Sequence, residues 1–234
     1  MTAISLPRLC ASAIPFFRQD GSLSDLARPE PCEIDFTEIA YGLAKIPRFT
    51  GTYTGLAYSV AQHSVMGAEA LLREGEDEFM AALFLLHDGH EYKLGDDSRP
   101  KQDLLFQMLE DFSPSSASAF RDVMHRAKAG WDTAIYSAAG LPSPDAWTKK
   151  QQKTIATMDV RMAAAEAEAL FGDAARKVYP VSKYPPPLTR GLITPWGIMT
   201  AELRFLECFD RLIGEKQRKT ATNNHLMHRK GKRA

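Results

Sequence analysis

Residues 78–94 read EFMAALFLLHDGHEYKL, and their pattern changes sharply from apolar to polar. Residues 79–86 are apolar on every side, which is typical of a helix at the centre of a fold. His87 and Asp88 follow directly, and Glu91 comes one helical turn after His87. Burying an imidazole and a carboxylate is costly unless something pairs with them. The stretch therefore predicts a central helix that ends at a chemically active site.

Helical patterns also account for most of the chain on either side. A capping-box pattern, Thr148 to Gln151, predicts the start of a long helix that reaches about Phe171. No series of strands is visible, so the predicted fold class is all-α. Other helices are expected at about 34–45, from near Tyr58 onward, at 104–112 and at about 116–139. Thr194-Pro195 is expected to open the last helix, which should pack through Trp196, Met199, Leu203, Leu206 and Ile213.

The chain divides into three parts. Residues 1–34 contain proline and glycine turns and are expected to form an irregular N-terminal arm. Residues 35–214 hold the helical domain, with a proline-rich extended excursion at 180–195. Residues 215–234 carry Lys and Arg without apolar partners and are expected to be a disordered basic tail, in which His225 and His228 are solvated.

Composition limits the classes of partner. Lys+Arg and Asp+Glu both number 29, so the net charge is zero, which argues against nucleic-acid and membrane-surface binding. A small anionic ligand remains compatible with a local basic pocket. The three cysteines are scattered without a CxxC motif, which fits a reducing compartment. No apolar run reaches the roughly 20 residues of a membrane span, and the N-terminus does not read as a signal peptide, so we expect a cytoplasmic protein.

Four residues are candidate metal ligands. His63 lies on the helix before the central one, beside Gln62 and Ser64, and is a candidate third ligand in addition to His87 and Asp88. Asp159 interrupts a helix rich in Ala and Met, which suggests an inward-facing carboxylate. The alternative for Asp159 is an acidic residue on the surface, since Glu166 and Glu168 indicate a polar face on that helix. Two imidazoles and two carboxylates suit a divalent ion such as Mn, Co, Fe, Zn or Mg. The four candidate ligands are His63, His87, Asp88 and Asp159.

Acidic and basic residues near these ligands predict chemistry on a phosphate. Glu91 and Asp96 are placed to hold and deprotonate an attacking water, as general-base carboxylates do. Guanidinium and ammonium groups are what an incoming phosphate needs. The candidates for phosphate binding are Arg48, Lys93, Arg99 and Lys101.

The runs YSVAQHS at 58–64 and LLHDGHEYKLGD at 85–96 resemble the HD-domain phosphohydrolases. They are most similar to the bacterial and phage branch with 5′-deoxynucleotidases and deoxynucleoside triphosphate triphosphohydrolases. The resemblance covers about 35–171, extends more weakly to the final helix, and implies an HD-domain helical bundle, within 35–214, around a single metal site. It gives the ligand role to His63, His87, Asp88 and Asp159, the water and substrate contacts to Glu91 and Asp96, and a phosphate contact to Arg48 in PRFTG.

Two positions depart from this pattern, because Gly89 and Lys93 stand where Ala and a small or apolar residue are expected. The expected activity is hydrolysis of the 5′ phosphate ester of deoxynucleotides, from triphosphates or monophosphates, and the four basic residues favour extra phosphates. The alternatives are a phosphodiesterase for signalling nucleotides and a non-catalytic metal-binding module. The base, the native metal and the formation of a homo-oligomer are left open by the sequence.

Overall fold

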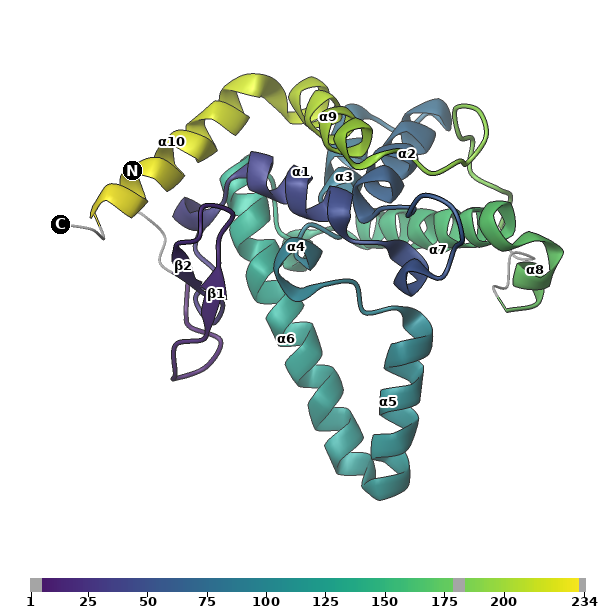
Figure 1. The fold of residues 1–234 in the computed structure, drawn as a ribbon, viewed down its shortest axis with the longest axis horizontal. Coiled ribbons are helices and arrows are strands. Elements are labelled where there is room, and N and C mark those ends of the chain that lie inside the picture. The colour runs from purple at the N-terminus through teal and green to yellow at the C-terminus, as the bar shows by residue number, and fades with distance from the viewer. Residues whose placement is uncertain (1–5, 179–183, 232–234) are drawn as a thin grey trace.

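Four helices form the centre of the protein in the computed structural model, which describes residues 6–178 and 184–231. They are α1 (Phe36–Lys45), α2 (Val60–Arg73), α3 (Glu78–Leu85) and α9 (Ile198–Phe209), and they pack against one another (Figure 1). Every residue from Met80 to Leu85 is buried, as predicted for a central helix. The described chain is mostly helical, and its only named strands are β1 (Pro15–Phe17) and β2 (Leu23–Asp25), which form an antiparallel hairpin in the N-terminal arm.

A close contact between α2 and α3 sets the positions of His63 and His87. Gly67 on α2 faces the Phe84 ring on α3, and a Cβ at that position would lie 2.1 Å from a ring carbon. Only glycine permits this approach of the two helices. Because α2 carries His63 and α3 leads into His87, the contact also sets the separation of these two imidazoles.

Polar caps define where several helices begin. Asp35, Ser59 and Asp77 each accept a backbone N–H from the first turn of α1, α2 and α3. The predicted capping box is present, with Thr148 and Gln151 exchanging hydrogen bonds at the start of α7 (Lys149–Phe171). Such caps satisfy backbone donors that a helix leaves unpaired at its N-terminus.

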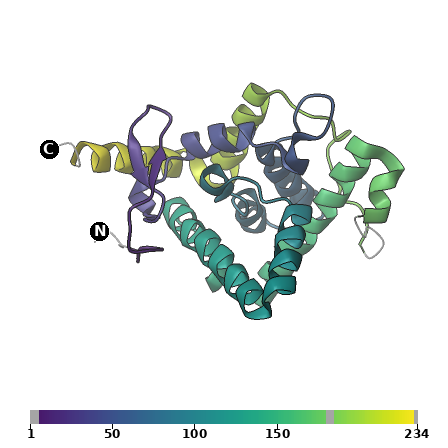
Figure 2. The same ribbon diagram turned by 60° about the horizontal axis from the view of Figure 1, so that its bottom comes forward.

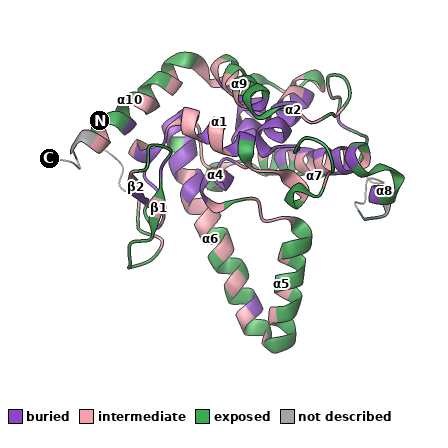
Figure 3. Cartoon of the chain, viewed as in Figure 1, coloured by how far each residue is buried: buried purple, intermediate pink, exposed green. Residues whose placement is uncertain are grey.

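Helices α5 (Arg99–Phe112) and α6 (Pro114–Ala139) form an antiparallel hairpin that projects from the body (Figures 1 and 2). Figure 3 shows how exposed the hairpin is, and α5 has no buried residue. α5 begins at Arg99 and not at the expected residue 104, because Pro100 suits the first turn of a helix. The loop after the one-turn helix α4 (Glu91–Leu94) is therefore only four residues long.

The remaining elements are short. The excursion expected at 180–195 has no helix or strand from residue 184 onward, and residues 180–183 lie outside the described residues. Across the described chain, no helix is long and apolar enough to cross a membrane. The short elements are the 3-10 turns η1 (Pro31–Glu33), η2 (Arg48–Gly51), η3 (Pro144–Ala146) and η4 (Gly172–Ala174), and helix α8 (Ala175–Val178).

The predicted packing face of the last domain helix is correct only in part. Trp196, Leu206 and Ile213 are partly buried and pack against the core, but Met199 and Leu203 do not. α9 starts at Ile198 and turns Ala201, Phe205, Cys208 and Phe209 into the core. Met199 and Leu203 are 84% and 57% exposed. The sequence is apolar on both sides of α9, so the contacts with α1 and α2, rather than the apolar spacing, select the buried side.

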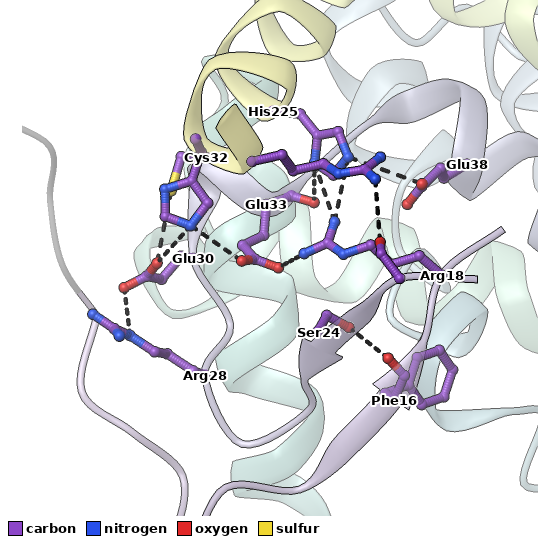
Figure 4. A network of polar contacts seen from close by, with 12 residues as sticks. Phe16, Arg18, Ser24, Arg28, Glu30, Cys32, Glu33, Glu38 and His225 are labelled. Atoms are coloured by element: carbon purple, nitrogen blue, oxygen red, sulfur yellow. Dashed lines mark hydrogen bonds and ion pairs between the residues drawn. The ribbon is translucent and has the colours of Figure 1, made fainter. Parts of the chain in front are cut away.

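The prediction of a disordered tail is wrong for residues 215–231. A π-helical turn, η6 (Asp210–Gly214), leads into α10 (Glu215–Gly231), which packs against η1 and α6. His225 is buried, its Nδ1 donates to the Glu33 carbonyl at 3.1 Å, and Arg18 donates to its Nε2 at 3.3 Å (Figure 4). Arg18 also pairs with the buried Glu33 side chain. These polar partners, which lie far away in the sequence, hold a helix that has few apolar residues.

Candidate metal centre

The four predicted ligands meet where α2, α3 and α7 converge. His63 lies in the first turn of α2, and Asp159 lies in the middle of α7. His87 and Asp88 are not on α3 itself, which ends at Leu85, but in the tight turns that follow it. One ligand atom from each of the four residues lies within 4.8 Å of the other three. We call His63, His87, Asp88 and Asp159 the ligand cluster.

The spacing of these atoms suits a metal ion. Asp159 Oδ1 lies 3.2 Å from His63 Nε2 and 3.7 Å from His87 Nε2, and the two Nε2 atoms are 3.4 Å apart. Asp88 Oδ2 lies 3.3 Å from His87 Nε2 and 3.7 Å from His63 Nε2. Nitrogen and oxygen ligands at the usual 2.0–2.1 Å from a tetrahedral ion would be separated by about 3.3–3.4 Å. The residues present therefore fit a small divalent cation.

The cluster is closed on one side and open on the other. The His63 side chain is fully buried, and those of His87 and Asp88 are 10% and 16% exposed. Asp159 is 42% exposed. Water or a ligand can therefore reach the cluster from the side of Asp159 and Asp88.

Both imidazoles are oriented through their other nitrogen. His87 Nδ1 donates to the Phe84 carbonyl at 2.7 Å, and because a carbonyl only accepts, the neutral ring leaves Nε2 as an acceptor. His63 Nδ1 lies 2.6 Å from Glu166 Oε1 and donates to it. Both Nε2 atoms thus face the cluster and can offer a lone pair to a cation that displaces their protons, the arrangement that metal-bound histidines usually have.

Glu166 is a buried partner of the ligand cluster that the sequence pattern did not predict. It is completely buried and accepts hydrogen bonds from His63, from Tyr58 Oη at 3.0 Å and from Arg48 Nε at 3.0 Å. Taking Glu166 as part of a polar surface was therefore wrong. A signal was available, because Glu166 follows Asp159 by seven residues, or two helical turns, and so lies on the same face of α7.

Charges in the cluster hold protons where a cation would sit. Burial and Arg48 oppose protonation of His63, but Glu166 and Asp159 outweigh them and raise its pKa to about 9. Neighbouring protein atoms partly desolvate the Asp159 carboxylate, but hydrogen bonds from His63 and His87 hold its pKa well below its usual range. Acidic groups outnumber Arg48 here, so a divalent cation would replace the bound protons and balance the charge.

Glu91 and Asp96 lie beside this cluster on the connection after α3. A carboxylate oxygen of Glu91 is within 4.8 Å of Asp88, and its Oε2 is buried without a hydrogen-bond partner in the described chain. Burial, Asp88 and Asp96 raise the pKa of Glu91 well above its ordinary value. Burial also raises the pKa of Asp96, which Arg48 opposes and Asp88 and Asp97 reinforce. Such shifted carboxyl groups often mark a functional site.

Arg48 reaches the cluster from the loop before α2. Its backbone N–H donates to the Tyr58 carbonyl at 2.8 Å, which closes the loop that ends at Tyr58. Its guanidinium contacts Glu166 and also lies 3.5 Å from Asp88 Oδ2. The adjacent Phe49 and Thr50 have φ values of 55° and 54°, a left-handed conformation that is strained for side chains of this kind.

The other three predicted phosphate ligands lie elsewhere. Lys93 is buried against the rings of Phe16 and Tyr92, and burial lowers its pKa to about 8. Arg99 is 78% exposed and pairs with Asp103, and Lys101 pairs with Asp97. The structure brings none of the three into an ion pair with the ligand cluster; Arg48 is the predicted cation that it places there.

The fold and the site define a mostly helical protein with a His/Asp cluster that could hold a metal ion. No family model matches the chain. An uncharacterized protein of Rhodobacter capsulatus is 32% identical over 185 residues, which make up 74% of this chain and 81% of that protein. The chain belongs to the same family as this Rhodobacter capsulatus protein.

Proposed function

We propose that this protein is a metal-dependent phosphohydrolase of the HD-domain type that cleaves the 5′ phosphate ester of deoxynucleotides. The observation that carries the proposal is the pairing of the ligand cluster with a buried carboxyl group, Glu91, and a guanidinium, Arg48. A binding module would gain nothing from leaving Glu91 Oε2 buried and unpaired, since such a group destabilises the fold. A catalytic role accounts for it, because the free oxygen can take a proton.

Each residue has a separate task in this chemistry. A divalent ion bound by His63, His87, Asp88 and Asp159 would supply Lewis acidity and lower the pKa of a water molecule. Glu91 would accept the proton of the attacking water on Oε2. Arg48 would donate to phosphate oxygens on the open side of the cluster, while Glu166 holds its Nε in place. Asp96, near Arg48, would help to orient the water.

A pocket between α5 and α6 suits the rest of a nucleotide. It has a volume of about 390 Å³, within the range of small-molecule sites, and it begins at Asp97, next to Asp96. Lys128 lies on its wall, and its charge opposes the rise in the pKa of Glu91. Aromatic and basic side chains line it, which suits a planar base and negative phosphates: Lys101, Phe106, Phe120, Arg121 and Lys128.

The decisive experiment is product analysis. The four deoxynucleoside monophosphates, diphosphates and triphosphates, with cyclic and guanosine signalling nucleotides beside them, would each be incubated with protein loaded with Mn, Co, Fe, Zn or Mg. We expect turnover of deoxynucleotides with at least one metal. The products should be the deoxynucleoside together with phosphate, pyrophosphate or tripolyphosphate, and the basic pocket favours the triphosphates. Chelator-treated protein and Glu91→Gln are the controls. No turnover of any nucleotide by the metal-loaded protein would overturn the proposal, and turnover confined to cyclic or guanosine signalling nucleotides would replace it with a phosphodiesterase.

A further inference from the structure

A second group of metal-binding side chains lies between the N-terminal arm and α10. Glu30 and Cys32 come from the segment at η1, and His228 comes from the end of α10. One ligand atom of each lies within 4.8 Å of the other two. Glu30 and Cys32 lie side by side (Figure 4), with Glu30 Oε2 3.7 Å from Cys32 Sγ. Glu30 Oε2 also lies 3.8 Å from His228 Nε2. None of these residues belongs to the ligand cluster or to the proposed reaction.

We propose that Glu30, Cys32 and His228 form a second divalent-metal site, which fastens α10 to the N-terminal arm. One thiolate, one imidazole and one carboxylate are a donor set that suits zinc. A tetrahedral ion with sulfur at about 2.3 Å and nitrogen or oxygen at about 2.0–2.2 Å would separate sulfur from oxygen by about 3.5–3.7 Å and nitrogen from oxygen by about 3.3–3.5 Å. The distance from Glu30 to Cys32 falls in the first range, and the distance from Glu30 to His228 would have to shorten by about 0.3 Å on binding. Water would take the fourth position.

One donor is already oriented by its surroundings. Arg28 holds Glu30 Oε1 at 2.7 Å, so that Oε2 is the oxygen that faces Cys32 and His228. A partner of this kind fixes the orientation of a metal ligand in known sites. His228 Nε2, the atom that would bind the ion, lies 3.1 Å from Glu33 Oε1. On binding a cation, the Cys32 thiol would release its proton to solvent, and His228 would exchange its contact with Glu33 for the ion.

The reason for such a site is the polar character of α10. Among the described side chains of this helix, only Ala221 and His225 are buried. Apolar burial therefore contributes little to its attachment. A bound ion adds its binding free energy to the folded state, because the ligands come from opposite ends of the chain and meet only after folding.

Cobalt is a suitable probe because its thiolate complexes absorb in the near ultraviolet, and the ligand cluster contains no cysteine. Metal-free full-length protein would be titrated with cobalt chloride while absorption and bound metal are measured. We expect two ions per chain and one thiolate-to-cobalt absorption band. Cys32→Ser should abolish the band and leave one ion, and His228→Ala should weaken the binding that gives the band at least tenfold. The matched control Cys10→Ser should keep the band, since Cys10 is exposed on the same arm.

The outcome is independent of the proposed enzyme. His87→Ala, which removes a residue of the ligand cluster, should keep the band while losing the other ion. Absence of a band in the wild-type protein, or a band that survives in Cys32→Ser, would overturn the second site. Circular dichroism of each variant distinguishes loss of the site from loss of the fold. Cys32→Asp replaces the thiolate with a carboxylate ligand, so this variant should bind two ions without showing the band.

Discussion

Two buried histidines, His63 in the ligand cluster and His225 in the C-terminal network, have opposite charge environments. Carboxylates surround His63 and raise its pKa to about 9, despite burial and Arg48. Burial lowers the pKa of His225, and Arg18 adds to the effect although Glu38 opposes it. The first region has an excess of negative charge that a cation can neutralise, whereas Arg18 already balances the second. The charge around a buried histidine, rather than its burial, therefore distinguishes a candidate metal ligand from a structural residue.

Removing a metal ligand tests the first region most severely. His87→Ala or Asp88→Ala should lower the rate about 10⁴-fold, because the lost ion contributes several kcal/mol to the transition state. Elemental analysis should show one ion fewer per chain. Asp122→Ala, which changes an exposed acid on α6, is the matched control and should retain both metal and rate. Full metal content and full turnover in both ligand variants would show that the cluster is not the active site.

Glu91 should separate catalysis from metal binding. Glu91→Gln should keep the ion but lower kcat about 10³-fold, near the middle of the range for a general base. Glu78→Gln, an exposed position at the start of α3, should leave kcat unchanged. Metal loss in Glu91→Gln would move Glu91 into the ligand set instead.

Substitution of Arg48 should lower kcat/KM by a similar factor for nucleotides of every base. Arg48→Ala should lower kcat/KM by about 10- to 150-fold, since a charged hydrogen bond in a partly buried site is worth about 1.5–3 kcal/mol. Arg48→Lys should recover only part of this loss, because an ammonium group cannot form the two-pronged contact of a guanidinium. The measurement compares the four deoxynucleotides in parallel. A loss confined to one base would make Arg48 a base-recognition residue.

Glu166 should act on the metal through His63. Glu166→Gln should raise the Kd of the cluster for its ion about 10- to 100-fold, as is typical for a carboxylate that orients a metal-bound histidine. Glu168→Gln on the same helix is the control and should bind normally. Calorimetric titration with the metal measures this directly, and equal affinity in wild type and Glu166→Gln would show that Glu166 only fills the core.

His225 should give the smallest effect, a pH-dependent one. The pKa of His225 is lower in the folded state than in the unfolded state. As the pH falls below about 6.5, the unfolded chain therefore binds a proton at His225 before the folded chain does. Stability should therefore fall with acidification, by no more than about 1.4 kcal/mol per pH unit for one proton. Urea unfolding at pH 7.5 and 5.5 should show a shallower fall in His225→Gln. The groups that face His225 and act on its pKa are Arg18, Asp35, Glu38 and Arg229. If the variant shows the same slope, these groups and not His225 determine how the free energy of unfolding depends on pH.

Local patterns predicted much of the ligand cluster and little of the C-terminal network. The apolar run before His87 and the capping box at Thr148 are properties of neighbouring residues, so the central helix and α7 could be predicted. Glu166 was misassigned because its role depends on His63, which is 103 positions away. The attachment of α10 was missed for the same reason, since nothing near His225 in the sequence indicates that Arg18 will be its partner.

The attachment of α10 also bears on the order in which the chain folds. Arg18 and His225 are 207 positions apart, whereas the ligand cluster and Glu166 need no residue beyond position 166. Contacts between such distant residues form slowly, because a long loop must close before they stabilise anything. We expect the N-terminal arm, although it is synthesised before α10, to gain protection from hydrogen exchange only after α10 has been made.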